Sequence, residues 1–128
     1  MDERDRFRIL IAQPQAAARQ VMREYLQAQR GLDVVGEADN GRDLLAQAEA
    51  LGPDLVLLEW NLPGRSGAEL IVTMQEARCR PQVVVFGLRP EWSQAATDAG
   101  ADAYVYMGRG PRELVTTIRW VTLEAQYA

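Results

Sequence analysis

Five short apolar runs, separated by stretches with helical periodicity, constrain the fold of this chain more than any other feature. They are rich in Val, Ile and Leu and lie at Arg8–Ala12, Asp33–Ala38, Asp54–Trp60, Gln82–Leu88 and Ala103–Met107. Most of them do not alternate apolar with polar residues, a pattern typical of strands that are covered on both faces. The runs therefore predict five buried, parallel β-strands.

Each run is followed by a segment in which apolar residues recur with the spacing of one helix face. Asn40 and Ser66 are suitable N-caps for the second and third segments, Gly100 is a natural stop for the fourth, and Pro111 suits the first turn of the last. The helix-face residues are Ala18, Val21, Met22, Tyr25, Leu26, Leu44, Leu45, Ala48, Leu51, Leu70, Ile71, Met74, Trp92, Ala95, Ala96, Ala99, Leu114, Ile118 and Val121. Alternating strands and helices imply βαβ units with right-handed crossovers. We expect one α/β domain over residues 1–128, a (βα)5 three-layer sandwich around a five-stranded parallel sheet.

Composition excludes several classes of function. The net charge of −4 argues against direct binding of nucleic acid, because phosphate recognition needs a basic face. Cys79 is the only cysteine, so no internal disulfide forms, and no apolar run approaches the roughly 20 residues that span a bilayer. We expect a cytoplasmic protein without membrane contact. The chain has no histidine and no lysine, which removes an imidazole base and a mobile ammonium from any site.

In parallel α/β sheets the functional site lies at the carboxyl ends of the strands. A dinucleotide site would need a glycine-rich turn after the first strand, but the turn here is Ala12-Gln13-Pro14-Gln15-Ala16. It contains no glycine, and Pro14 removes a backbone donor. The sequence therefore argues against nucleotide binding of that kind.

Three segments resemble the receiver domains of bacterial response regulators. Pro53–Gly67, which reads PDLVLLEWNLPGRSG, is similar to the third strand and following loop of that family. Gly36–Gly41 resembles the second strand and its turn, and Gly100–Tyr104 resembles the start of the fifth strand in the NarL/FixJ branch, which is fused to helix-turn-helix DNA-binding domains. The resemblance covers about residues 8 to 121. It implies the CheY-like, flavodoxin-like sheet order 2-1-3-4-5.

The resemblance also implies a degenerate phosphorylation site. In the family, Mg²⁺ assists phosphoryl transfer to an aspartate, whose position holds Glu59 here. The acidic pair after the first strand becomes Gln13 and Pro14, the hydroxyl residue after the fourth becomes Gly87, and the lysine after the fifth becomes Met107. Mg²⁺ needs several oxygen ligands in a tight octahedron. We therefore expect no bound Mg²⁺ or other metal, no cofactor and no enzymatic activity.

Several of these positions have more than one interpretation. The Glu59 carboxylate either mimics a phosphorylated acceptor or is a strand-end residue satisfied by water or by Arg109 or Arg89; the second is favoured slightly. Met107 and Pro14 most simply fill the space that the ion and the ammonium group occupy in the family. Gly87 is either a flexible point or a small residue beside a large one, and the second is favoured. Tyr104 matches the aromatic that switches position in the family, or it is a half-buried tyrosine on an edge strand.

The last predicted helix carries a second apolar stripe. Trp120, Leu123 and Tyr127 fall within about 60° of one another on a helical wheel, away from the core residues of that helix. The stripe is either a contact surface or part of a frayed chain end. With Trp92 and Tyr104 it would form the face made by the fourth helix, fifth strand and fifth helix, through which receivers commonly contact partners. We expect a homodimer or a protein partner on this face.

The sequence thus predicts an atypical receiver that works as a phosphorylation-independent interaction or dimerisation module. Two alternatives stay open: a receiver still phosphorylated by an altered route in a phosphorelay, and a small-molecule sensor that uses the vacated pocket at the strand ends. The sequence names neither partner nor pathway. It also leaves open the oligomeric state, whether Glu59 holds an active-like or inactive-like state, and whether an output domain follows Ala128.

Overall fold

The structure, a computed structural model, describes residues 6–78 and 80–127, without the side chains of residues 124–127. It contains a five-stranded parallel sheet in the order β2-β1-β3-β4-β5. The elements are β1 (Phe7–Ala12), α1 (Ala16–Gln27), β2 (Leu32–Ala38), α2 (Gly41–Leu51), β3 (Leu55–Glu59), α3 (Gly67–Glu76), β4 (Gln82–Gly87), α4 (Trp92–Asp98), β5 (Ala103–Tyr106), the 3-10 turn η2 (Met107–Arg109) and α5 (Arg112–Tyr127). The predicted fold and strand order are confirmed.

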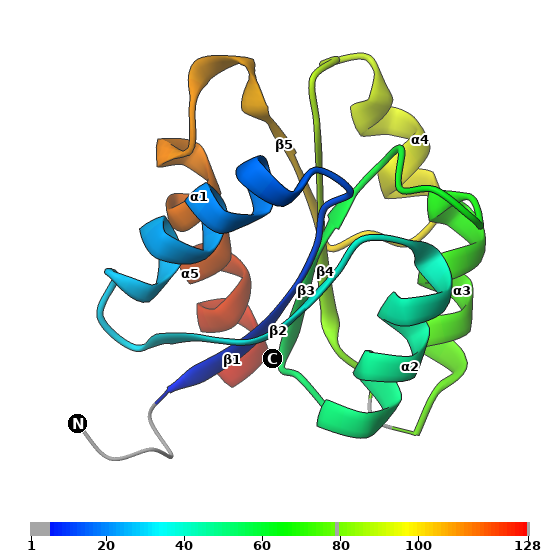
Figure 1. Cartoon of the computed structure of the whole chain (residues 1–128), viewed down its shortest axis with the longest axis horizontal. Helices are drawn as coiled ribbons and strands as arrows, with labels where there is room; N and C mark the ends of the chain where they lie inside the picture. Colours follow the sequence, from blue (N-terminus) through cyan, green and yellow to red (C-terminus); the bar gives the residue numbers. More distant parts are fainter. Residues whose placement is uncertain (1–5, 79, 128) are drawn as a thin grey trace.

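The sheet lies between two layers of helices, with α1 and α5 on one face and α2, α3 and α4 on the other (Figure 1). Alternate residues of the central strands point to opposite faces. Ile9 and Ile11 of β1 therefore pack with Leu26 and Ile118 on the α1 and α5 side. Leu10 packs with the helices of the other side. Burial on both faces explains why β1, β3 and β4 are continuously apolar in the sequence.

Local signals place most element boundaries correctly. The Asn40 side chain accepts the backbone N–H of Asp43 at 2.9 Å, and the Ser66 hydroxyl accepts that of Glu69 at 3.2 Å, so both predicted caps are present. Gly100 has a φ of +109°, which favours glycine. Three predicted strands end one residue too late, because β3, β4 and β5 stop at Glu59, Gly87 and Tyr106, and the predicted third strand also starts one residue before Leu55.

The apolar face of α1 is only partly buried, which corrects the sequence interpretation. Met22 and Leu26 belong to the core, whereas Val21 is 62% exposed and Tyr25 is half-buried. The sheet covers the side of α1 that carries Met22 and Leu26. The remaining apolar residues of the stripe lie beside a cavity at the strand ends.

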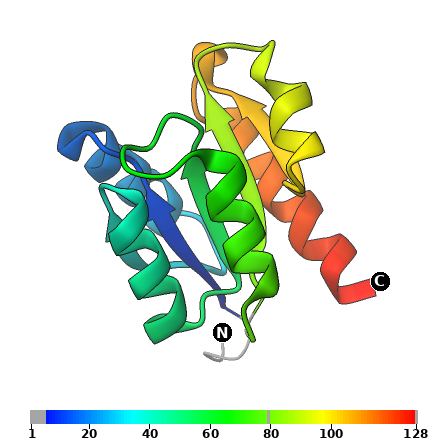
Figure 2. The same cartoon turned by 90° about the vertical axis from the view of Figure 1, so that its right-hand side faces the viewer.

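The last helix lies against β5 and extends past the sheet at its C-terminal end (Figure 2). Leu114, Ile118 and Val121 bury its inner face, as the periodicity predicts. Within residues 6–78 and 80–127, no helix combines the length and apolar character needed to cross a bilayer.

Candidate functional site

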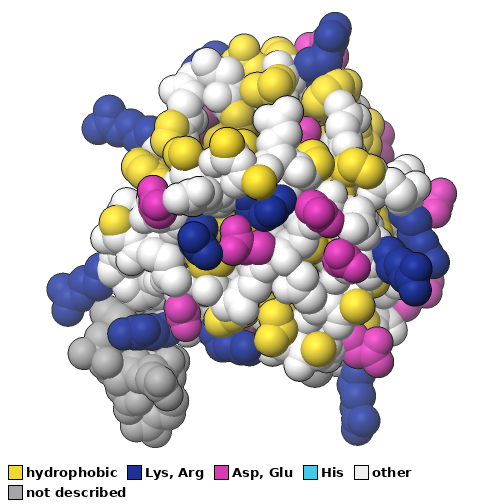
Figure 3. Space-filling view, viewed as in Figure 1, with side chains coloured by type: hydrophobic (Ala, Val, Ile, Leu, Met, Phe, Trp, Pro, Cys, Tyr) yellow, Lys and Arg dark blue, Asp and Glu magenta, His cyan; other side chains and the backbone are white. Residues whose placement is uncertain are grey.

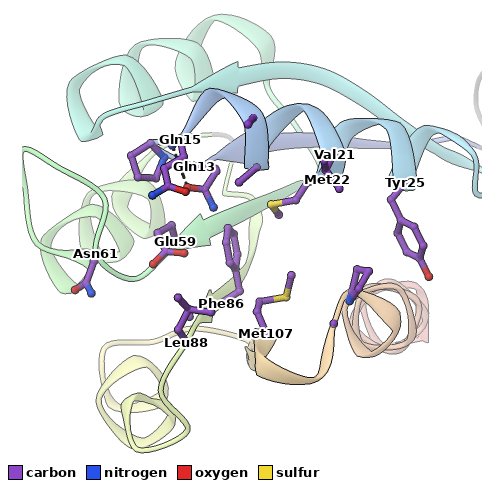
Figure 4. Close-up of a pocket in the computed structure, with 16 residues that line it drawn as sticks. Gln13, Gln15, Val21, Met22, Tyr25, Glu59, Asn61, Phe86, Leu88 and Met107 are labelled. Atoms are coloured by element: carbon purple, nitrogen blue, oxygen red, sulfur yellow. Dashed lines mark hydrogen bonds between the residues drawn. The ribbon is translucent and has the colours of Figure 1, made fainter.

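The strand ends bring together all five positions at which the sequence suggested a lost phosphorylation site. Gln13 and Pro14 follow β1, Glu59 ends β3, Gly87 ends β4 and Met107 follows β5. All five line one cavity of about 630 Å³ (Figure 4). The register places Glu59 beside Phe86 of the neighbouring strand, and the Glu59 side chain lies at one end of this cavity (Figure 4).

Glu59 is half-buried, and its surroundings disfavour the charged form. Desolvation raises the pKa of its carboxyl above the ordinary value, and the backbone N–H of Asn61, which donates to the carboxylate, offsets part of this. Neither arginine that the sequence suggested as a partner reaches it. Arg89 pairs with Glu91 at 2.7 Å and Arg109 with Glu113 at 3.4 Å. Among the described residues, no cation lies within ion-pair distance of Glu59.

Gln13 serves the loop after β1. Its side-chain oxygen accepts the backbone N–H of Gln15 at 3.1 Å, and its carbonyl oxygen accepts a hydrogen bond from Arg19 at 2.8 Å. The amide oxygen therefore already has a donor, and the adjacent Pro14 supplies no side-chain ligand.

This donor set does not fit the family's magnesium ion. Glu59 offers the single carboxylate of the cavity lining, whereas Mg²⁺ binding in such sites relies on carboxylates and water in a strict octahedron. Across residues 6–78 and 80–127, no three His, Cys, Asp or Glu side chains lie close enough to share a metal ion. That the protein binds no Mg²⁺ stays a prediction.

The space beside Gly87 is filled by two aromatic side chains. A Cβ on Gly87 would lie 2.7 Å from the hydroxyl oxygen of Tyr104 and 2.8 Å from Cε3 of Trp92, closer than carbon atoms approach one another. Gly87 is thus a small residue beside large ones, as the sequence interpretation favoured. A serine or threonine at this position would collide with the Tyr104 hydroxyl and the Trp92 ring.

Tyr104 is half-buried on the edge strand β5 and is held at its hydroxyl. The hydroxyl donates to the backbone carbonyl of Arg89 at 2.6 Å, and this bond ties β5 to the loop before α4. Desolvation raises the pKa of the phenol, so the neutral, donating form persists. These contacts fix Tyr104 in the space beside Gly87, which is free because glycine has no side chain.

The cavity extends well beyond the five positions that match the family's phosphorylation site. In Figure 4 Glu59, Gln13 and Gln15 lie at one end, Tyr25 lies at the other, and Met22, Phe86 and Met107 lie between them. The lining consists of Gln13, Pro14, Gln15, Ala17, Ala18, Val21, Met22, Tyr25, Glu59, Asn61, Phe86, Gly87, Leu88, Met107, Gly110 and Pro111. The contribution of α1 was missed, because its apolar stripe looked like an ordinary core face. Leu88, which the sequence places inside a buried strand, is instead 70% exposed beside this cavity.

The proposed contact stripe on α5 is exposed where it is described. Trp120 is 61% exposed and Leu123 is 49% exposed, so neither belongs to the core. The side chain of Tyr127 lies outside the described residues. Trp92 is half-buried, with its ring against Gly87, and presents less of its surface than the sequence suggested.

Comparison with known proteins assigns the family. Residues 9–119 match the response regulator receiver domain family. The nitrate/nitrite response regulator NarL of Escherichia coli is 35% identical over 89 residues, which are 68% of this chain and 41% of NarL. The transcriptional regulatory protein ResD of Bacillus subtilis is 28% identical over 93% of this chain and 49% of its own length. The chain spans less than half the length of either relative.

Solved structures agree with this assignment. A LuxR-family DNA-binding response regulator from Staphylococcus aureus superposes with a TM-score of 0.82 at 28% identity, over 90% of this chain and 98% of that one. The receiver domain of a NarL homologue from Mycobacterium tuberculosis has a TM-score of 0.81 at 23% identity, over 89% of this chain and 94% of that one, and shows the shared fold. Sequence and fold together establish that the chain belongs to the response regulator receiver domain family of two-component signalling.

Proposed function

We propose that this receiver works without phosphorylation, as a protein-interaction or dimerisation module without enzymatic activity. The observation that carries the proposal is the packing at Gly87. Gly87 has no hydroxyl that could hold a phosphoryl group, and Trp92 and Tyr104 lie so close to it that no side chain fits there unless they move. The cytoplasmic location expected from the sequence is part of this proposal.

The face made by α4, β5 and α5 is the proposed contact surface. Trp120 and Leu123 expose large apolar side chains on α5, next to the strand that carries Tyr104. Aromatic residues are enriched at interfaces because they bury much area at little entropic cost. With no phosphoryl group to gate this face, association is set by protein concentration alone, either between two copies or with a separate protein.

Sedimentation and mass measurement test the proposal together. Wild-type protein should self-associate to the same extent with and without acetyl phosphate and Mg²⁺, and intact mass should show no added phosphate. Trp120→Ala should weaken the association by about 2 kcal/mol, roughly 30-fold in dissociation constant. Val72→Ala, which truncates an exposed apolar residue on α3, is the matched control. A phosphoryl adduct, or association that requires the donor, would overturn the proposal in favour of an altered phosphorelay route.

A second function is favoured by the cavity at the strand ends. Its volume of about 630 Å³ falls within the range of roughly 300–1,000 Å³ that small-molecule sites occupy. Such a site would let a ligand take the regulatory place of the phosphoryl group. We therefore propose small-molecule sensing as the alternative input to the same contact face.

A further inference from the structure

The cavity at the strand ends has apolar walls contributed by three separate parts of the chain. Met22 comes from α1, Phe86 from β4 and Met107 from the turn after β5 (Figure 4). Methionine side chains are flexible and polarisable, and they adapt their shape to different apolar groups. The walls therefore suit the body of an apolar molecule without fixing its outline.

Exposed apolar residues frame the opening of this cavity. Val21 is 62% exposed and Leu88 is 70% exposed, and both belong to the cavity lining. Figure 3 shows hydrophobic side chains gathered at the end of the molecule that carries the loops after β4 and β5. Burying such surface under a ligand releases its hydration, at roughly 25 cal/mol per Å² of apolar area.

One end of the cavity carries a single negative charge. Glu59 is the only charged side chain among the lining residues, and the cavity holds neither an arginine nor another acid. Asn61 supplies one backbone donor to the carboxylate, which has room for several more. The neighbouring amide oxygen of Gln13 already has its own donor in Gln15. Glu59 thus faces the cavity with unused acceptor capacity and no counter-charge.

We propose that the cavity binds an amphipathic amine, with its ammonium group on Glu59 and its apolar body between Met22, Phe86 and Met107. This inference rests on the sensing function proposed for the cavity and adds the chemical class of the ligand. An ammonium supplies three N–H donors and the missing positive charge, and a charge-assisted hydrogen bond is about twice as strong as a neutral one. A carboxylate ligand of the same shape would meet Glu59 with like charge in a poorly solvated site.

A matched series of indole compounds tests the charge requirement. Tryptamine is the cationic probe, indole-3-propionate the anionic one, and 3-(3-hydroxypropyl)indole a neutral one of similar size. In calorimetric titration at pH 7, tryptamine should bind at least about tenfold more tightly than indole-3-propionate, with the neutral compound between them. Glu59→Gln keeps the shape and should abolish this preference. Glu24→Gln, on the exposed part of α1 and outside the cavity lining, should preserve it.

A second variant tests the cavity independently of the charge. Ala17 is an exposed residue of α1 that lines the cavity, so Ala17→Trp places a large ring at its wall with little disturbance of the core. It should weaken tryptamine binding at least about tenfold, while Ala46→Trp on the exposed face of α2 should not.

The outcomes separate the two levels of the proposal. Binding of indole-3-propionate as tight as that of tryptamine, still blocked by Ala17→Trp, would overturn the amine and leave sensing in place. If no compound of the series binds, or if Ala17→Trp has no effect on binding, both the amine proposal and the proposed sensing function are overturned.

Discussion

At the scale of single residues, two features of Glu59 affect the chemistry of the site most. Its side chain is one methylene longer than the aspartate of the family, and it has no cation partner among the described residues. The carboxyl lies where receivers place their acceptor, but it is half-buried without a cation among the described residues. Ionisation of Glu59 therefore lowers the free energy of unfolding relative to the neutral carboxyl. The same unpaired charge is what makes the cavity selective in our proposal.

This cost predicts how stability responds to pH. The pKa of Glu59 is raised in the folded state, so the folded protein binds this proton more readily than the unfolded chain. Its contribution to stability is fully present below the ordinary carboxyl pKa of about 4.5 and is lost as pH rises through the higher folded value. Tyr104 lies near enough for the Glu59 carboxylate to help raise the pKa of its phenol.

Glu59→Gln should therefore be more stable than wild type at pH 7. Solvent screening of a half-exposed group limits the gain to about 1 kcal/mol or less. Urea unfolding at pH 4, 5, 6 and 7 measures it, and the difference between the variant and wild type should shrink as pH falls. Glu24→Gln controls for removal of one negative charge from an acidic chain. A difference that grows toward low pH would show that the ionised carboxylate is stabilised in the folded state.

At the scale of elements, the contact of α4 with the end of β4 depends on the absence of a side chain. Trp92, the first residue of α4, and Tyr104 of β5 both lie against Gly87. A side chain at this position would have to push the Trp92 ring and the Tyr104 hydroxyl aside. In this protein the two aromatic rings instead close the carboxyl end of the sheet on the side of α4.

Gly87→Ala should consequently destabilise the fold by about 1–3 kcal/mol, the usual cost of overpacking a close-packed site. Trp92→Phe removes part of the colliding ring, so the double variant should lose less than the sum of the two single changes. Urea unfolding of all four proteins gives the coupling free energy. Strict additivity would mean that Gly87 and Trp92 do not compete for the same space.

At the scale of the whole molecule, the five positions that match the family's phosphorylation site come from the ends of four strands, β1, β3, β4 and β5. Gln13 and Pro14 follow β1, and Glu59 ends β3, which pairs with β1 in the sheet. We therefore expect that restoring a single residue restores neither Mg²⁺ binding nor phosphorylation. The fold holds the positions in place, whereas the metal requires several carboxylates to converge.

Glu59→Asp alone should bind no Mg²⁺ and accept no phosphoryl group. The variant that combines it with Gln13→Asp and Pro14→Asp should bind Mg²⁺ saturably, because three carboxylates then converge at the strand ends. Calorimetric titration with MgCl2 measures this, and CaCl2 serves as a second ion of different size. Phosphorylation and Mg²⁺ binding in the single variant would show that the other substitutions leave the site competent.

The order of strands and helices was fully readable from the sequence, because it depends on patterns within short segments. Continuous Val, Ile and Leu runs identify strands buried on both faces, and Asn40 and Ser66 cap their helices through bonds made within three residues. The resemblance also located Gln13, Pro14, Glu59, Gly87 and Met107 on one sheet edge, and the structure brings them together.

Only the tertiary structure decided what surrounds the five positions at the strand ends. Trp92 and Tyr104 fill the place beside Gly87, and Met22 shares a cavity wall with Phe86. Among the described residues, Glu59 has no cation within ion-pair distance. Each of these features depends on elements that are far apart in the chain. Periodicity states which side of a helix is apolar, but not whether the sheet covers all of it, which is why Val21 looked like core and lies 62% exposed. The volume of a cavity and the balance of charge around a residue depend on all the neighbours in space. A single segment of sequence therefore does not determine them.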